Sequence, residues 1–123
     1  MAAVARLKRR PEFLAVAANR RRWVAPGLIL QVARRPEDSS LPPAPRIGFT
    51  ASRKVGIAVA RNRARRRLKA AVEAILPKSG QPGFDYVVIA RTETLTRPFA
   101  DLVADLETAL ARVHESRQKS GAA

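Results

Sequence analysis

The spacing of hydrophobic residues changes several times along the chain, and each change predicts a different element. A short helix is expected to begin at Pro11, because proline is tolerated in a first helical turn and apolar residues then recur at helical spacing. The run from Leu28 to Arg34 and the alternating run from Arg46 to Ser52 predict strands. Between them, residues 34–45 are rich in proline and polar side chains, which predicts an exposed loop within the domain.

The second half of the chain predicts two longer helices around a buried strand. Over residues 60–76 the apolar side chains form one stripe, and Pro77 and Gly80 are expected to end this helix. Residues 85–90 are nearly all apolar, as in an interior strand, and a last amphipathic helix is expected to begin at Pro98. With the run from Arg46 to Ser52 counted as a third strand, the order α-β-β-β-α-β-α predicts an α/β fold of the α+β kind, arranged as a two-layer sandwich.

Composition predicts one domain without disulfides or structural zinc. The 123 residues are 46% hydrophobic, which is enough for a core, while cysteine is absent and His114 is the one histidine. We place the domain at residues 1–115 and expect residues 116–123 to form a flexible tail. No apolar run is long enough to span a membrane, and the N-terminal residues lack the apolar core of a secretion signal. We therefore expect a cytoplasmic protein with no membrane partner.

Charge narrows the class of partner. The chain has 24 Lys and Arg against 10 Asp and Glu, a net charge of +14, and residues 54–69 contain seven cations and no acid. A solvated helix face normally mixes both signs, so this one-sided run favours a polyanionic partner. Arginine dominates the run, and its planar guanidinium binds phosphate through two hydrogen bonds. The composition favours nucleic acid and leaves RNA and DNA both open.

A few single residues invite a structural interpretation. Gly56 is expected to supply a backbone angle that other residues resist, and Asn62 is a candidate N-cap of the basic helix. Asp101, Asp105 and Glu107 lie close together near a helix start, where the helix dipole explains them better than a metal site. We expect neither a catalytic residue nor a metal site in the protein itself.

The basic segment also has a specific pattern. KVGIAVARNRARRRLK resembles the RNR signature of the bacterial ribonuclease P protein family, in which a Lys-Val/Ile-Gly turn precedes Arg-Asn-Arg and further spaced basic residues. The stretches LKRRPEF, RIGFTASRKVG and DYVVIAR resemble other parts of that family, so the resemblance covers most of the chain. The positions that match the signature are Lys54, Val55, Gly56, Arg61, Asn62, Arg63, Arg65, Arg66 and Lys69.

Several positions depart from the family pattern. Family members often carry Asn at the position of Ile57 and Arg at that of Lys69, and these changes look tolerable. Many members place a second aromatic residue where this chain has Ala17, and a strand that often ends in Tyr reads Gln31-Val32 here. Stacking on unpaired nucleotides would therefore rest on Phe13, with arginine contacts contributing more of the binding.

The resemblance implies the protein subunit of an endoribonuclease whose RNA subunit holds the catalytic Mg²⁺ and removes the 5′ leader from precursor tRNA. It implies a cleft for the leader between the first helix and the sheet, with Phe13, Arg53 and Lys54. It also implies a left-handed crossover carrying the basic helix, no cofactor bound by the protein alone, and a monomeric protein within the ribonucleoprotein. The surface that binds ribonuclease P RNA would consist of Arg61, Asn62, Arg63, Arg65, Arg66, Arg67 and Lys69.

Two other functions share the charge and size of this chain. One is a structural, ribosomal-type RNA-binding protein with no role in cleavage, against which the spacing of the RNR segment argues. The other is a nucleoid-type DNA-binding protein, which would require minor-groove wedges or a dimeric scaffold, and the sequence indicates neither.

Overall fold

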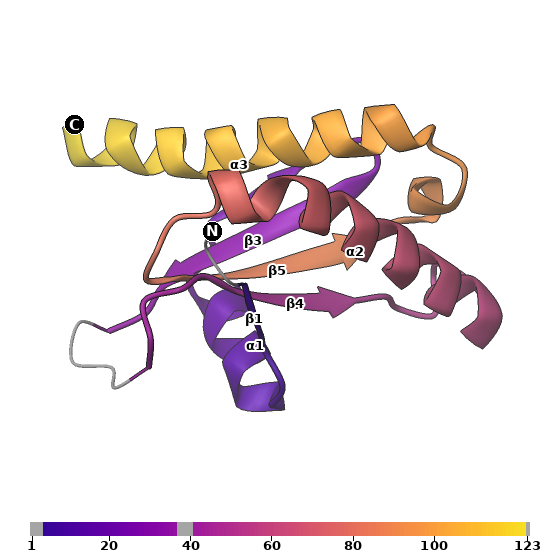
Figure 1. Ribbon diagram of the computed structural model, residues 1–123, viewed down its shortest axis with the longest axis horizontal. Coiled ribbons are helices and arrows are strands. Elements are labelled where there is room, and N and C mark those ends of the chain that lie inside the picture. The colour runs from indigo at the N-terminus through magenta and orange to yellow at the C-terminus, as the bar shows by residue number, and fades with distance from the viewer. Residues whose placement is uncertain (1–3, 37–40, 123) are drawn as a thin grey trace.

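The computed structural model describes residues 4–36 and 41–122, with side chains described as far as residue 115 (Figure 1). It contains a five-stranded sheet, three α-helices and a short 3₁₀ segment. From α1 onward the elements follow the predicted order of helix, three strands, helix, strand and helix, and the unpredicted strand β1 precedes them. The elements are β1 (Ala5–Arg6), α1 (Arg10–Ala18), β2 (Arg22–Val24), β3 (Leu28–Arg34), β4 (Arg46–Thr50), α2 (Ala58–Ser79), β5 (Phe84–Ala90), η1 (Thr92–Leu95) and α3 (Phe99–Ala122).

The sheet is mixed, with the strand order β1-β4-β5-β3-β2. β4 runs parallel to both β1 and β5, whereas β3 pairs antiparallel with β5 and with β2. Because β4 and β5 are parallel neighbours, the chain must cross over between them, and α2 makes this crossover. The left-handed course of the crossover stays a prediction.

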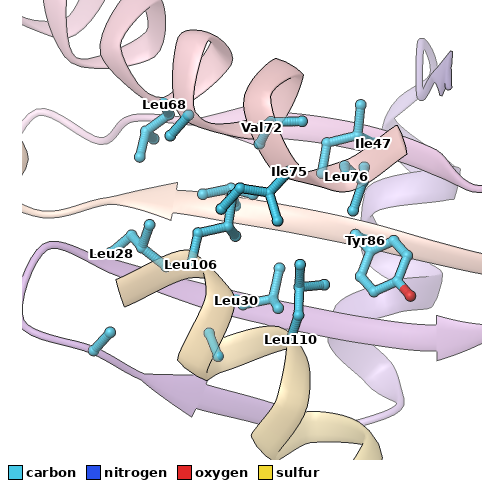
Figure 2. Close-up of a cluster of buried hydrophobic side chains, with 14 of the residues drawn as sticks. Leu28, Leu30, Ile47, Leu68, Val72, Ile75, Leu76, Tyr86, Leu106 and Leu110 are labelled. Atoms are coloured by element: carbon cyan, nitrogen blue, oxygen red, sulfur yellow. The ribbon is translucent and has the colours of Figure 1, made fainter. Parts of the chain in front are cut away.

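Alternate residues of β5 face opposite sides of the sheet. Tyr86, Val88 and Ala90 face α2 and α3, where they join Leu30 of β3 in the main core (Figure 2). The stripe predicted for α2 is confirmed, since its buried residues are Ala64, Leu68, Ala71, Val72, Ile75 and Leu76. Burial of each large apolar side chain contributes about 1.5–3 kcal/mol, so this stripe docks α2 and leaves its other side to solvent.

Helix α1 lies on the face of the sheet opposite to α2 and α3 (Figure 1). Val16 of α1 packs there with Leu7 and with Val87 of β5. The predicted two-layer sandwich is therefore correct for the main core but incomplete, because α1 adds a partial third layer. The nearly continuous apolar sequence of β5 is the reason, since a strand that is apolar on both faces needs cover on both.

The ends of α2 agree with the prediction only in part. The helix begins at Ala58, so Asn62 lies within it and is not its N-cap, the position that Ile57 occupies. Pro77 does not end the helix, because it stands in the final turns, where only one backbone hydrogen bond is lost. Gly80 does end it as predicted, since α2 stops at Ser79 and the N–H of Gly80, its C-cap, bonds the carbonyl of Leu76. The backbone of α3 is helical through Ala122, and the flexible tail beyond residue 115 stays a prediction.

Candidate nucleic-acid interface

A tight turn joins β4 to the basic helix. The N–H groups of Val55 and Gly56 bond the carbonyls of Ser52 and Arg53 at 3.1 Å each. Gly56 has φ +145°, and a Cβ on it would lie 2.9 Å from the Cβ of Ala60, so the expected special backbone angle at this glycine is confirmed. The turn thereby fixes where α2 begins relative to the end of β4.

The solvent side of α2 carries cations without acidic partners. Arg63, Arg66 and Lys69 are exposed, and Arg65 is half-buried and donates to Oδ1 of Asn62 at 2.7 Å. Within the part of the chain that the structure describes, no ion pair includes a cation from residues 54–69. The positive charge of this surface is therefore uncompensated, as binding to a polyanion requires.

Arg67 differs from its neighbours on α2. Its guanidinium donates to the carbonyls of Thr94 at 2.8 Å and Leu95 at 3.0 Å, and also to the carbonyl of Arg97. Arg67 stands next to the buried Leu68, on the flank of α2 that faces η1. The side chain thus joins α2 to the segment after β5, and its predicted RNA contact would compete with these bonds.

A hollow of about 610 Å³, here called the Phe49 hollow, lies between α2 and the β1–β4 edge of the sheet. The guanidinium of Arg6 lies 5.0 Å from the centre of the half-buried Phe49 ring. Sequence reasoning assigned neither residue to a site, because the two residues of β1 are too few to show a strand pattern. The residues lining the hollow are Arg6, Phe49, Val59, Asn62, Arg65, Arg66 and Lys69.

The opposite face of the sheet is only partly covered by α1. Beyond that helix, Ile29 and Ile89 are half-buried and form part of a hollow of about 450 Å³, here called the Lys54 hollow. The predicted leader residue Lys54 lines it, whereas Phe13 and Arg53 do not. The lining residues are Ile29, Ser52, Lys54, Val55, Ile89, Ala90, Arg91, Thr92 and Glu93.

Phe13 packs on the same face of the sheet, over Gly48. A Cβ at Gly48 would lie 2.4 Å from Cε2 of Phe13, so the ring rests directly on the backbone of β4. Phe13 is half-buried and packs against the cluster of Leu7, Val16 and Val87. Arg53 is exposed in the turn after β4. The structure thus brings Phe13 and Lys54 to one face of the sheet without joining them in one hollow.

Charged side chains fix the start of α1 on the sheet. One oxygen of Glu12 accepts from the backbone N–H groups of Lys8 and Arg9 at 2.8 Å each, and the other accepts from Arg46 at 2.6 Å. The bond from the N–H of Arg9, then that from Lys8 and the pairing with Arg46, lower the pKa of Glu12 to about 2. Arg46 in turn binds both oxygens of Asp85 in β5.

The remaining acids are also used structurally. Asp105 is buried and accepts from the N–H of Gly27 at 2.9 Å and from Arg97 at 2.8 Å, so it binds neighbouring segments rather than acting only on the helix dipole. The ring Nε2 of His114 lies within hydrogen-bond distance of the Tyr86 hydroxyl, at 2.8 Å. Among the described residues, no group of three or more His, Cys, Asp or Glu side chains could hold a metal ion.

No helix within the described ranges is long and apolar enough to cross a membrane.

Comparison with known proteins agrees with the resemblance seen in the sequence. A sequence profile for the family Ribonuclease P matches residues 1–114. The ribonuclease P protein component of Paramagnetospirillum magneticum is 55% identical over 108 residues, covering 88% of this chain and 81% of the relative. That of Ruegeria pomeroyi is 47% identical, covering 88% and 85%.

Solved structures share the fold at lower identity. The ribonuclease P protein of Thermotoga maritima superposes with a TM-score of 0.70 at 23% identity, covering 87% of this chain and 96% of the other. That of Staphylococcus aureus gives 0.68 at 22% identity, covering 86% and 92%. The mixed sheet with three helices is therefore an arrangement that these proteins also have.

Proposed function

Because the chain belongs to the bacterial ribonuclease P protein family, and is thus the protein component of an endoribonuclease of tRNA processing, we propose that α2 binds ribonuclease P RNA. We propose further that the α1 face of the sheet binds the 5′ leader of precursor tRNA. The observation that carries the proposal is the row of unpaired cations on a helix whose other side is docked in the core.

Binding of the RNA subunit would depend mainly on phosphate contacts. Each guanidinium or ammonium group that neutralises a phosphate releases counterions, which makes the affinity depend on salt. The rigid helix holds these groups at fixed spacing before the RNA arrives, so little conformational entropy is lost on binding. Arg67 contributes less to this surface, because its guanidinium already donates to carbonyls of η1. The residues proposed for the surface are Arg61, Asn62, Arg63, Arg65, Arg66 and Lys69.

Binding of the leader would use the uncovered part of the sheet. Ile29 and Ile89 offer an apolar floor against which bases can pack, and Lys54 lies at its rim to pair with a phosphate. Phe13 would add a stacking surface beside α1, and Arg53 a further cation. A single strand fits such a site better than a duplex, because its bases are free to leave the stack.

The protein would supply position and charge, and the RNA subunit the chemistry. Mg²⁺ held by the RNA would activate the water that cleaves the phosphodiester bond. Cations of the protein would bring leader and catalytic RNA together and lower the repulsion between them. We propose one copy of the chain in the ribonucleoprotein, acting in the cytoplasm, with α2 in a left-handed crossover.

Reconstitution with the ribonuclease P RNA of the same organism tests the proposal. At low magnesium concentration, the mixture should cleave a 5′-extended precursor tRNA at the mature 5′ end, whereas the RNA alone and the protein alone should be much slower. Replacement of Arg61, Arg63, Arg65 and Arg66 by Ala should weaken assembly. If the protein binds the RNA tightly and leaves cleavage unchanged, a structural RNA-binding role replaces the proposal.

A further inference from the structure

We propose that the Phe49 hollow holds one unpaired nucleotide of the bound RNA, with its base in the stack that Phe49 and Arg6 form and its phosphate among the surrounding cations. This inference rests on the proposed RNA-binding function and adds to it a base-binding site beside the phosphate-contacting row, which supplies part of its lining. The structural basis is the joint presence of an aromatic ring, a stacked guanidinium and several cations around one hollow.

The hollow has two chemically different parts. Phe49 and Val59 give it an apolar wall. The side chain of Val59 is 71% exposed, so its apolar surface is available to a ligand. Arg65, Arg66 and Lys69 give the other part its positive charge. A ligand that matches both parts carries a flat apolar body and an anionic group, which describes a nucleotide.

Pairs already present in the hollow favour a base over a simple anion. Arg6 lies over the Phe49 ring at 5.0 Å, so the planar guanidinium and the aromatic ring already form a stack that a base can extend. Asn62 accepts a hydrogen bond from Arg65, which orients its amide beside the hollow and leaves its N–H₂ to a base edge. Inorganic phosphate would use only the cations.

The size of the hollow also suits a base that has left its stack. Its volume of about 610 Å³ falls within the range of small-ligand sites, about 300–1,000 Å³, so one nucleotide fits and a duplex does not. Its place beside α2 means that RNA bound by the exposed cations of that helix passes the mouth of the hollow.

The first test compares two probes on the isolated chain. Two-dimensional amide spectra are followed while adenosine 5′-monophosphate or inorganic phosphate is added. The nucleotide should shift the signals of Arg6 and Phe49 at a concentration about tenfold lower than phosphate, as expected for one stacked base. In the variant Phe49→Leu this advantage should disappear. Equal effects of the two probes would show a simple anion site and overturn the proposal.

Two matched pairs of variants carry the test to the ribonucleoprotein. Phe49→Leu should weaken assembly with ribonuclease P RNA about tenfold without changing the salt dependence, while Phe99→Leu, which changes an exposed ring on α3, should have no effect. Arg6→Gln should weaken assembly and reduce the salt dependence. Its control is Arg112→Gln, because Arg112 lies over Trp23 at 5.6 Å in a similar stack outside the hollow.

Loss of folding must be separated from loss of binding. Phe49 packs against the core, so the amide spectrum of Phe49→Leu must first show a folded protein. Arg6 is exposed, so Arg6→Gln tests the hollow even if Phe49→Leu does not fold. Assembly of both hollow variants with wild-type affinity would overturn the proposal. Failure of the wild-type protein to promote cleavage would instead contradict the proposed function, while the nucleotide probe would still report on the hollow.

Discussion

Phe13 shows how one side chain serves the fold and remains available to a ligand. Its ring rests on Gly48, the β4 position where the absence of a side chain allows this close approach. The ring is half-buried, so one part packs against the cluster around Val16 and another part faces solvent on the sheet face proposed for the leader. Since Ala17 offers no second ring, this exposed part is the stacking surface that α1 provides.

Replacement of Phe13 by Ala should therefore weaken binding of precursor tRNA more than that of mature tRNA. The expected difference is about 1–3 kcal/mol, the usual effect of losing one stacked base. Competition binding to the assembled ribonucleoprotein measures it. Leu14→Ala is the control, because Leu14 is 53% exposed on the same helix. Equal losses for both RNAs would assign Phe13 to the core alone.

Tyr86 is the one tyrosine of the chain, so a titration that follows tyrosine ionisation reports on this side chain alone. Burial raises the pKa of Tyr86 to about 12, although the N–H of Gln81, which donates to the hydroxyl at 2.9 Å, partly offsets this effect. The folded state thus holds the proton more tightly than the unfolded state, in which the pKa is about 10. The stability that this provides is complete below about pH 10 and is lost as the pH rises towards 12.

Ultraviolet absorbance of the tyrosinate ion tests this expectation. In the folded protein, the transition should have its midpoint near pH 12, and in denaturant it should return to about pH 10. A midpoint of about 10 under native conditions would show that the hydroxyl is open to water, in contradiction to its position in the core.

At the scale of the element, α2 divides its arginines between two tasks. Arg66 is exposed and belongs to the surface proposed for RNA, whereas Arg67 donates to carbonyls of η1. Arg66→Ala should leave stability within about 0.5 kcal/mol of wild type and reduce the log–log salt slope of RNA binding by about 0.7–0.9.

Arg67→Ala should show the reverse behaviour. It should lower the free energy of unfolding by about 1–3 kcal/mol, because the carbonyls of Thr94 and Leu95 in η1 lose their donor, and it should change the salt slope little. Urea unfolding and RNA titration at several salt concentrations give both quantities. If the Arg67→Ala protein is as stable as wild type and its RNA binding has a smaller salt slope, Arg67 contacts RNA and does not stabilise the fold.

The elements that the sequence predicted well are those whose pattern is long. β3 has its predicted bounds, and the stripe of α2 repeats over several turns. β1 was missed and β2 was expected only as an unplaced strand of the order, because two or three residues cannot show a period. The missed strand β1 is the one that brings Arg6 beside Phe49. Asn62 was misjudged as a cap because composition does not mark the first turn of a helix that starts in the apolar run after Gly56.

The candidate site was predictable as a set of cations but not as a pair of hollows. The spacing of residues 61–69 indicates which side chains share a helix, and an ideal helix then places them approximately. The Lys54 hollow depends instead on how much of the sheet α1 leaves uncovered, which is a property of tertiary packing. Likewise, the pairing of Arg46 with both Glu12 and Asp85 joins residues from three elements, and no local pattern reveals it.

At the scale of the whole molecule, a net charge of +14 is held on 123 residues, and the unpaired cations of α2 repel one another. Raising sodium chloride from a low concentration to about 0.15 M should raise the Tm, because screening weakens this repulsion more than it weakens the buried ion pairs. Calorimetry at several salt concentrations checks it. A Tm that falls with salt would show that attractive surface pairs dominate.

The tight turn at Gly56 fixes the distance between the two proposed RNA-binding surfaces. Lys54 and Arg61 stand on either side of this turn, so the surface proposed for the substrate and the surface proposed for the catalyst are joined by a few residues fixed by hydrogen bonds. If both proposed surfaces bind their RNAs, the protein would hold the substrate and the catalytic RNA at a fixed distance from each other. Lengthening the turn by one residue would shift where the substrate is cut, rather than only how fast.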